Sequence, residues 1–412
     1  MSRFTIVGAG QSGLQLAIGL LGDGHDVTVI SNRTPEEIAN GRVSSSQCMF
    51  DKSQSFEREL GINFWDDLTP PVEGISFTIP HPEVAGAKAL TWASRLDNVA
   101  RSVDQRVKMP RWINEFEKRG GTLVFEDAGI DDLERYVLDA DLVLVAAGKG
   151  EIARMFDRDP EKSPYAAPQR ALALTYVTGL APREDFSAVA FNLIPGVGEY
   201  FVFPALTTSG PCEIMVFEGV PGGPMDRWAG VTDPAEHLAI SLDILKTFLP
   251  WEFERTANVK LTDANGVLAG SFAPTVRFPI ATLPSGAKVL GLADVVVLND
   301  PITGQGSNNA SKCAKSYLES IRSHTGQFDA EFMQEAFDSY WAESQFVTAW
   351  TNAMLSPPPP FILNLLGAAG GIPEIAKRFT EGFNDPTDFA EWFLDPVGAE
   401  KFLADASARA AA

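Results

Sequence analysis

The sequence predicts an α/β protein in which a parallel β-sheet is followed by a mainly antiparallel sheet and a C-terminal helical region. Three observations predict this architecture. A strand, a glycine-rich turn and a helix open the chain, alternating strands fill its middle, and apolar residues recur at helical spacing towards its end. The glycine-rich turn predicts that the first domain is Rossmann-like.

The N-terminal segment has the pattern of a βαβ unit. Residues 4–7 are mostly β-branched or aromatic, glycines recur over residues 8–13, and apolar residues at helical spacing begin at Leu14. Gly24 ends the predicted helix, and residues 26–30 alternate as a second strand. Because such a unit takes about 30 residues, we expect the two strands to be parallel, with a right-handed crossover.

Three later apolar runs, at residues 122–125, 142–147 and 288–292, are expected to extend the parallel sheet. Residues 171–206 and 212–219 instead alternate between apolar and polar positions, with Pro and Gly turns among them. This second pattern predicts the antiparallel sheet of another domain.

Helical spacing returns from Gly304 onward and again over residues 332–349 and 389–403, with the prolines at 357–360 as a rigid connection. A domain division follows from these patterns. We expect residues 1–70, 96–165 and 283–325 to form the first domain, residues 71–95 and 166–282 the second, and residues 326–412 the helical region.

Composition excludes several classes of function. The 412 residues include 33 basic and 54 acidic ones, and the net charge of −21 argues against binding to nucleic acid or to an anionic membrane. No apolar run approaches the roughly 18–20 residues of a membrane-spanning helix. The three cysteines and four histidines lack the spacing of a disulfide framework or a metal site. We therefore expect a cytoplasmic enzyme without a metal.

Gly8, Gly10 and Gly13 form a G-x-G-x-x-G motif between the first strand and the first helix. Glycines at these positions let a pyrophosphate approach the unpaired N–H groups of a helix N-terminus. The motif therefore predicts a dinucleotide site that includes the intervening Gln11 and Ser12.

The end of the second strand leaves the identity of the dinucleotide open. A ribose-binding Asp or Glu is expected there, but the sequence has Asn32 and Arg33. One interpretation is NADP, with Arg33 facing the 2′-phosphate, and the other is FAD held without the usual carboxylate. Arg42 is either a ligand of the flavin phosphate or adenine, or an ordinary solvated arginine.

A second motif favours FAD. Asp294 follows a predicted strand, and a Pro-x-x-Gly-x-Gly run at residues 301–306 precedes a predicted helix. This arrangement resembles the second flavin motif of FAD hydroxylases of the glutathione-reductase type, and it implies a Rossmann-like FAD-binding domain of that type. Helix N-terminal N–H groups there suit the negative charge of reduced flavin. The resemblance implies FAD contacts from Asp294, Pro301, Gly304, Gln305, Gly306 and Asn308.

The sequence argues against an NAD(P)H site in this chain. No second G-x-G-x-x-G follows a strand, and residues 146–150 read Ala-Ala-Gly-Lys-Gly where single-component hydroxylases carry Gly-Ala-Asp-Gly. We therefore expect the flavin to arrive already reduced, as FADH2 from a separate reductase.

The motifs extend into a nearly full-length resemblance. The chain is similar to the FAD-dependent styrene and indole monooxygenases, the epoxidase components of two-component systems. The resemblance implies O2 as co-substrate, an NADH-dependent flavin reductase as partner and a small aromatic substrate, and it leaves a homodimer open. The segments that carry it are residues 7–10, Arg42, and residues 101–104, 168–172, 300–306, 378–380 and 383–384.

Pocket positions make the chain similar to the indole branch of that family. The styrene branch has a different residue at each of these positions. Epoxidation by a flavin hydroperoxide needs a dry, apolar cavity, which Met49, Val72, Ile75 and Ala100 would supply. Ser45 or Gln47 would accept a hydrogen bond from the indole N–H, which styrene lacks. The pocket residues implied by the resemblance are Ser45, Gln47, Met49, Val72, Ile75 and Ala100.

The leading expectation is therefore a monooxygenase that converts indole to its 2,3-epoxide and indoxyl, which leads to indigo. Styrene-type alkenes and aryl sulfides are the alternative substrates, because an apolar pocket discriminates weakly between flat rings of similar size. Two rivals remain: an NADP-linked oxidoreductase that uses Arg33, and a non-catalytic FAD-binding module. No side chain is expected to act as catalytic acid or base, since the flavin carries the chemistry.

Overall fold

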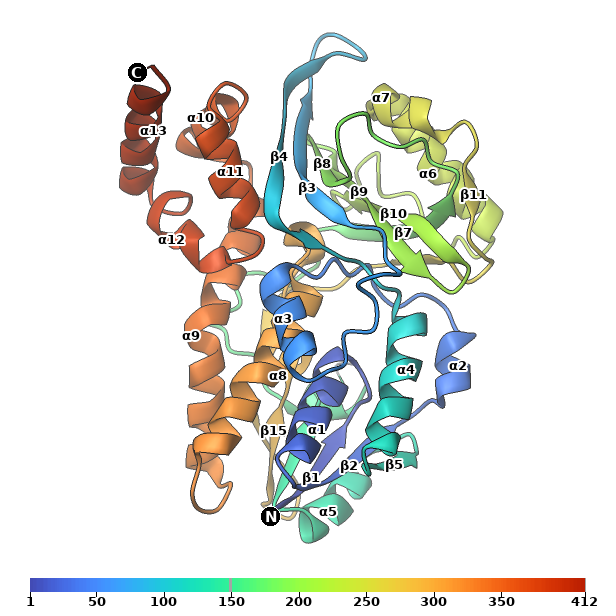
Figure 1. The fold of residues 1–412 in the computed structure, drawn as a ribbon, viewed down its shortest axis with the longest axis vertical. Helices are drawn as coiled ribbons and strands as arrows, with labels where there is room; N and C mark the ends of the chain where they lie inside the picture. Colours follow the sequence, from blue (N-terminus) through green and yellow to red (C-terminus); the bar gives the residue numbers. More distant parts are fainter. Residues whose placement is uncertain (148–149, 412) are drawn as a thin grey trace.

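The structure is a computed structural model that describes residues 1–147 and 150–411. Gly148 and Lys149, which belong to the run at residues 146–150, lie outside the described residues. The parallel-sheet domain lies at one end of the molecule and the antiparallel sheet at the other, with α9 (Ala330–Met354) running beside the parallel-sheet domain (Figure 1).

The first sheet contains the predicted βαβ unit. β1 pairs in parallel with β2 and with β6, so the carboxyl ends of these three strands meet at one edge. Only the antiparallel pairing of β14 with β15 departs from the parallel arrangement among the described strands of this sheet. The order across the sheet is β14 (Ile280–Thr282), β15 (Lys288–Gly291), β6 (Leu142–Val145), β1 (Arg3–Val7), β2 (Asp26–Ser31) and β5 (Thr122–Phe125).

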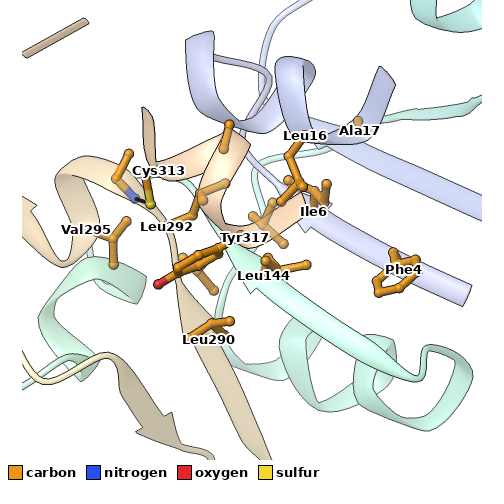
Figure 2. Close-up of a cluster of buried hydrophobic side chains, with 14 of the residues drawn as sticks. Phe4, Ile6, Leu16, Ala17, Leu144, Leu290, Leu292, Val295, Cys313 and Tyr317 are labelled. Atoms are coloured by element: carbon orange, nitrogen blue, oxygen red, sulfur yellow. Dashed lines mark hydrogen bonds between the residues drawn. The ribbon is translucent and has the colours of Figure 1, made fainter. Parts of the chain in front are cut away.

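Two helices that are far apart in the sequence pack side by side on this sheet. α1 (Gln11–Gly22) and α8 (Gly306–Ser323) run in the same direction, because Gln15 donates a hydrogen bond to the Ser311 carbonyl and Gly19 lies against Leu318 farther along both helices. A side chain at position 19 would come within 2.5 Å of Leu318. Figure 2 shows the apolar core beneath them, in which residues of α1, α8 and strands β1, β6 and β15 meet.

The second sheet is antiparallel apart from the parallel pairing of β3 with β8. β4 continues to Ala100, beyond residue 95, where the expected segment of the second domain ends. The hairpin of β3 and β4 projects past the rest of the sheet (Figure 1). The order is β11 (Lys260–Leu261), β7 (Ala171–Thr178), β10 (Gly210–Gly219), β9 (Gly198–Thr207), β8 (Ala188–Ile194), β3 (Val72–Pro80) and β4 (Lys88–Ala100), and β12 (Val267–Gly270) also pairs with β7.

Aromatic residues fix the C-terminal helices to the hairpin. The Trp92 indole stacks on Phe77, meets Phe379 edge-on and donates a hydrogen bond to the Leu366 carbonyl at 3.0 Å. The helix expected over residues 389–403 is wrong as a single element, since it divides before Pro396, which has no N–H for a continuous helix and suits the first turn of a new one. None of the helices in the described part of the chain combines the length and hydropathy needed to cross a bilayer.

The other elements complete these layers. The remaining helices are α2 (Pro35–Ala39), α3 (Asp51–Glu59), α4 (Gln105–Lys118), α5 (Ile130–Asp139), α6 (Pro234–Phe248), α7 (Pro250–Phe253), α10 (Pro360–Ala368), α11 (Pro373–Glu381), α12 (Phe389–Trp392) and α13 (Pro396–Ala411). The 3-10 turns are η1 (Ile152–Met155), η2 (Glu254–Thr256), η3 (Ala293–Val295), η4 (Pro301–Thr303) and η5 (Pro386–Asp388), and β13 (Thr275–Val276) pairs with β16 (Val297–Leu298).

Candidate flavin and substrate site

Two helix N-termini face the same edge of the parallel sheet. α1 begins after Gly10 and α8 after Gln305, and no described side chain caps either helix. The first turn of a helix has N–H groups without intrahelical partners, and its dipole favours negative charge. Because α1 and α8 are parallel, this edge offers two such sites to one anionic ligand.

The three glycines of the first motif have different tasks. Gly8 has φ +124°, and a Cβ there would come within 2.9 Å of the Ala146 backbone. A Cβ at Gly13 would lie 2.0 Å from the Gly8 carbonyl oxygen. Both residues are therefore glycine because the fold leaves no space for a side chain. A Cβ at Gly10 would meet nothing within 4 Å, so the space at Gly10 is open to a ligand.

The end of β2 presents positive rather than negative charge. Asn32 and Arg33 are exposed, and the Ser31 hydroxyl donates a hydrogen bond to the Arg33 carbonyl at 2.7 Å. The Arg33 guanidinium lies beside Gly41, which directly precedes the exposed Arg42. The structure thus brings together the two arginines proposed from the sequence, at an edge where a dinucleotide phosphate or adenine would lie.

Residues 299–306, called the flavin loop below, connect β16 to α8. The Asp300 carboxyl group accepts a hydrogen bond from the Ile302 N–H at 3.1 Å and so starts the turn that contains Pro301. Gly304 is in the left-handed conformation, with φ +63°. A Cβ at Gly304 or Gly306 would meet nothing within 4 Å, so the outer side of this loop is also open.

Asp294 lies next to a strained residue. Ala293 has φ +53°, and no other non-glycine residue in the described part of the chain has a positive φ. Such strain concentrates at functional sites, where surrounding contacts maintain it. Here the Ala293 N–H bonds the Cys313 sulfur of α8, and the exposed Asp294 follows directly. Asp294 thus lies just beyond the carboxyl end of β15, after a strained residue that a contact to α8 maintains.

Three residues predicted to bind the cofactor direct their side chains into the protein. Asn308 donates to the Cys48 carbonyl at 2.8 Å and accepts from the Phe50 N–H at 2.9 Å. Gln305 donates to the Phe383 carbonyl, and Gln11 donates to the buried Glu57. Their backbones lie at the starts of α1 and α8, but these side-chain amides connect segments of the protein.

The segment at residues 45–49 crosses from the flavin loop to the second sheet. Ser45 is fixed from two sides, because Tyr176 donates to its carbonyl at 2.8 Å and Gln105 to its hydroxyl at 3.2 Å. The Ser45 hydroxyl in turn donates to the Gln47 side-chain oxygen at 3.0 Å. Gln47 is 3% exposed, and its amide nitrogen has no partner among the described residues. Met49 pairs through its backbone with Arg101, next to Ala100.

The apolar residues predicted for the pocket do come together. Val72 of β3 lies opposite Ala100 of β4, and both are fully buried with Ile75. They belong to the same apolar cluster as Phe50, whose backbone N–H donates a hydrogen bond to Asn308, and Ile302 of the flavin loop. One continuous apolar cluster therefore includes residues of the second sheet and of the loop expected to hold the flavin.

Buried polar atoms without partners provide a test of whether a cofactor fits. Among the described residues, the side-chain nitrogen of Asn299, the side-chain oxygen of Gln305, and both the side-chain nitrogen and oxygen of Asn309 are buried without a hydrogen-bond partner. Such groups are costly unless a ligand or water satisfies them. Together with two uncapped helix N-termini and open space at three glycines, they fit a large polar ligand with an anionic part, which describes FAD.

A cluster of buried carboxyl groups, which the sequence analysis missed, lies behind the flavin loop. Arg170 binds Glu199 through two hydrogen bonds of 2.6 and 2.9 Å. Both oxygens of Glu218 lack a donor among the described residues, and its neighbour is Asp300. Burial and the nearby Asp300 and Glu199 carboxylates raise the pKa of Glu218 well above its usual range. Burial and these neighbouring carboxylates therefore favour the protonated form of Glu218.

Comparison with known proteins identifies the family. A family model described as "Styrene monooxygenase A putative substrate binding domain" matches residues 148–255. Styrene monooxygenase StyA of Pseudomonas fluorescens is 30% identical over 403 residues, which are 96% of this chain and 95% of that protein. The chain belongs to the styrene monooxygenase family. StyA of a second Pseudomonas is similar to the same extent.

Solved structures agree on the fold. A flavoprotein/dehydrogenase from Cytophaga hutchinsonii superposes with a TM-score of 0.65 at 12% identity, over 98% of both chains. The flavin-dependent halogenase CmlS has a TM-score of 0.64 at 16% identity, over 96% of this chain and 70% of its own. These likenesses confirm the α/β fold with its Rossmann-like FAD-binding domain.

Membership of the styrene monooxygenase family decides between the earlier interpretations. The protein is an FAD-dependent monooxygenase, so the prediction of FAD and O2 is confirmed and the NADP-linked and non-catalytic alternatives fall away. The indole expectation gains no support, because both curated relatives are named for styrene. The assignments of single site residues and of domain boundaries stay predictions.

Proposed function

We propose that the protein epoxidises styrene-type aryl alkenes with O2 and with FADH2 from a separate NADH-dependent flavin reductase. The observation that supports this most directly is the buried apolar cluster of Val72, Ile75 and Ala100, which reaches the flavin loop at Ile302. An apolar alkene needs no polar partner there. The names of the curated relatives point to the same substrate class.

The residues of this chain bind the flavin, orient the substrate and exclude water from the site. Reduced FAD supplies the electrons that activate oxygen. The N–H groups that begin α8 stabilise the negative charge at the flavin edge, and Asn308 keeps Phe50 against the flavin loop. Val72, Ile75 and Ala100 keep water away from the reacting atoms, which limits the loss of activated oxygen as peroxide.

Indole is the second candidate substrate, because Ser45 and Gln47 add polar atoms that an alkene would not use. The Gln47 side-chain oxygen already accepts from Ser45 and keeps one free lone pair for an indole N–H. Replacement of Gln47 by Leu should therefore reduce indole turnover more than styrene turnover, by about tenfold for one lost hydrogen bond. Equal losses with both substrates would remove this role of Gln47.

The first test supplies the purified protein with O2, NADH, FAD and an unrelated flavin reductase, and with styrene or indole in parallel reactions. We expect styrene oxide only when the reductase is present, at a rate above that of indigo formation. Product without the reductase would contradict the absence of an NAD(P)H site. Faster indigo formation would make indole the substrate, and peroxide alone in both reactions would contradict epoxidation.

The FAD site is tested separately by Gly10→Ala. The added Cβ meets no protein atom within 4 Å but enters the space expected for the pyrophosphate. We expect an unchanged melting temperature and at least about tenfold weaker flavin binding by titration, or 1.4 kcal/mol. Gly13→Ala is the contrasting variant, since its Cβ would collide with the Gly8 carbonyl and destabilise the fold itself. Unchanged flavin affinity in Gly10→Ala would place the pyrophosphate elsewhere.

A further inference from the structure

A groove with a volume of about 570 Å³ lies between α3, α8, α9 and η5. It shares no residue with the flavin loop or with the predicted pocket positions. Its lining includes three lysines, Lys52, Lys312 and Lys315, and an apolar side formed by Phe56 and Val347. The proposed function uses none of these side chains.

The three lysines differ in their partners. Lys52 pairs with Glu343 at 3.3 Å and with Asp385 at 3.6 Å. Lys315 pairs with Glu59 and Glu319, at 2.8 and 3.2 Å. Lys312 is only 8% exposed, and its amine has neither an ion pair nor a hydrogen bond within the described part of the chain. A buried amine without a counterion is destabilised in its charged form.

The charged groups around the groove shift the pKa of Lys312 in opposite directions. Burial and the positive charge of Lys52 lower the pKa of Lys312 to about 8, against the opposing influence of Asp385 and Glu343. The pKa of Lys315 is raised by its hydrogen bond to Glu59 and by Glu319. The two lysines are one turn apart on α8, yet only Lys312 offers an appreciable fraction of neutral amine near pH 8.

We propose that Lys312 is a covalent binding site for small aryl aldehydes, which enter the groove between α8 and α9. The lone pair of the neutral amine attacks the carbonyl carbon, and the carbonyl oxygen gains a proton from solvent while the nitrogen loses one. Loss of this oxygen as water then gives an imine, so the step is a condensation without oxidation or reduction. Phe56, Tyr340 and Val347 provide the surface for the aryl ring.

This proposal is independent of the epoxidation, because it concerns a different groove and needs neither flavin nor oxygen. To test it, the 412-residue chain is treated with benzaldehyde and sodium cyanoborohydride, which reduces an imine to a stable amine. The modified lysines are then mapped by peptide mass spectrometry. Lys315 and Lys52 are internal controls in the same groove. We expect Lys312 to be modified at least tenfold faster than Lys315 at pH 7.5, with a rate that rises to half its maximum near pH 8.

Two variants and a second aldehyde sharpen the test. Lys312→Met should lose the fast modification, and Lys315→Met should retain it with the same pH profile. With acetaldehyde the preference for Lys312 over Lys315 should fall, because the ring contacts are lost. Modification of Lys312 no faster than that of Lys315 would overturn the site. An equal preference with acetaldehyde would overturn the aryl specificity.

Discussion

The molecule contains a buried cluster of ionisable side chains in each of its two sheet-based regions, and the two are balanced differently. Beneath α1, Lys108 of α4 pairs with Glu57 of α3, and Gln11 donates a further hydrogen bond to the same carboxylate. Behind the flavin loop, Arg170 neutralises Glu199, while neither Glu218 nor Asp300 forms an ion pair with a residue that the structure describes. The charges of the first cluster balance each other. The second cluster has more carboxyl groups than cations, so one of its carboxyl groups is favoured in the protonated form.

The difference indicates distinct tasks. The buried pair, in which Glu57 accepts hydrogen bonds from both Lys108 and Gln11, holds α3, α4 and α1 together, and its two charges balance each other. An excess of buried carboxyl groups makes the protonation state part of the structure. Since Asp300 also starts the turn of the flavin loop, its electrostatic interaction with Glu218 connects this loop to the second sheet.

The largest effect is expected from Lys108→Met. The substitution leaves the Glu57 carboxylate buried without its cation and should lower the free energy of unfolding by about 3–5 kcal/mol, measured by urea denaturation. The double variant with Glu57→Gln removes both charges and should recover most of that loss. A double variant as unstable as the single one would show that packing, and not charge balance, decides this cluster.

A pH-dependent effect is expected from Glu218→Gln. In the unfolded chain Glu218 ionises above about pH 4.3, whereas in the folded protein it keeps its proton because its pKa is raised. The stability of the native protein therefore falls by about 1.4 kcal/mol per pH unit through this residue, from the unfolded pKa up to the folded one. The Gln variant lacks this slope.

Urea denaturation at several pH values between 5 and 7 measures the difference between the Glu218→Gln variant and the unsubstituted protein. The difference should increase in favour of the variant as the pH rises, with a slope of at most about 1.4 kcal/mol per pH unit for one proton. A constant difference would mean that Glu218 is ionised in the folded protein.

A smaller effect is expected from Glu199→Gln. A hydrogen bond to a charged group contributes about 1.5–3 kcal/mol, but Asp300 or Glu218 can ionise beside Arg170 and replace part of it. We expect a net loss below about 2 kcal/mol at pH 7 and a shallower decrease of stability with pH than in the unsubstituted protein. A loss as large as that of Lys108→Met would show that the spare carboxyl groups do not compensate.

The difference between local contacts and contacts of distant segments explains which features of the site could be predicted from the sequence. The turn at Gly8, Gly10 and Gly13 is visible in the sequence because all its constraints lie within one strand, turn and helix. The motif predicts that the backbones of Gln305 and Asn308 lie at the start of a helix, but it does not predict the directions of their side chains, which bind distant carbonyls. The contact between Glu218 and Asp300 joins segments with no common pattern and left no sign in the sequence.

The sequence by itself determined the βαβ unit, the class of cofactor and the change from a parallel to an antiparallel sheet, because periodicity and glycine spacing act over short distances along the chain. Only the tertiary structure decided that the N-termini of α1 and α8 lie together. It also decided that Val72, Ile75 and Ala100 share an apolar cluster with the flavin loop, and that three carboxyl groups surround one arginine. These features depend on packing between distant segments. Burial and charge, rather than the local sequence pattern, determine the free energy of folding there.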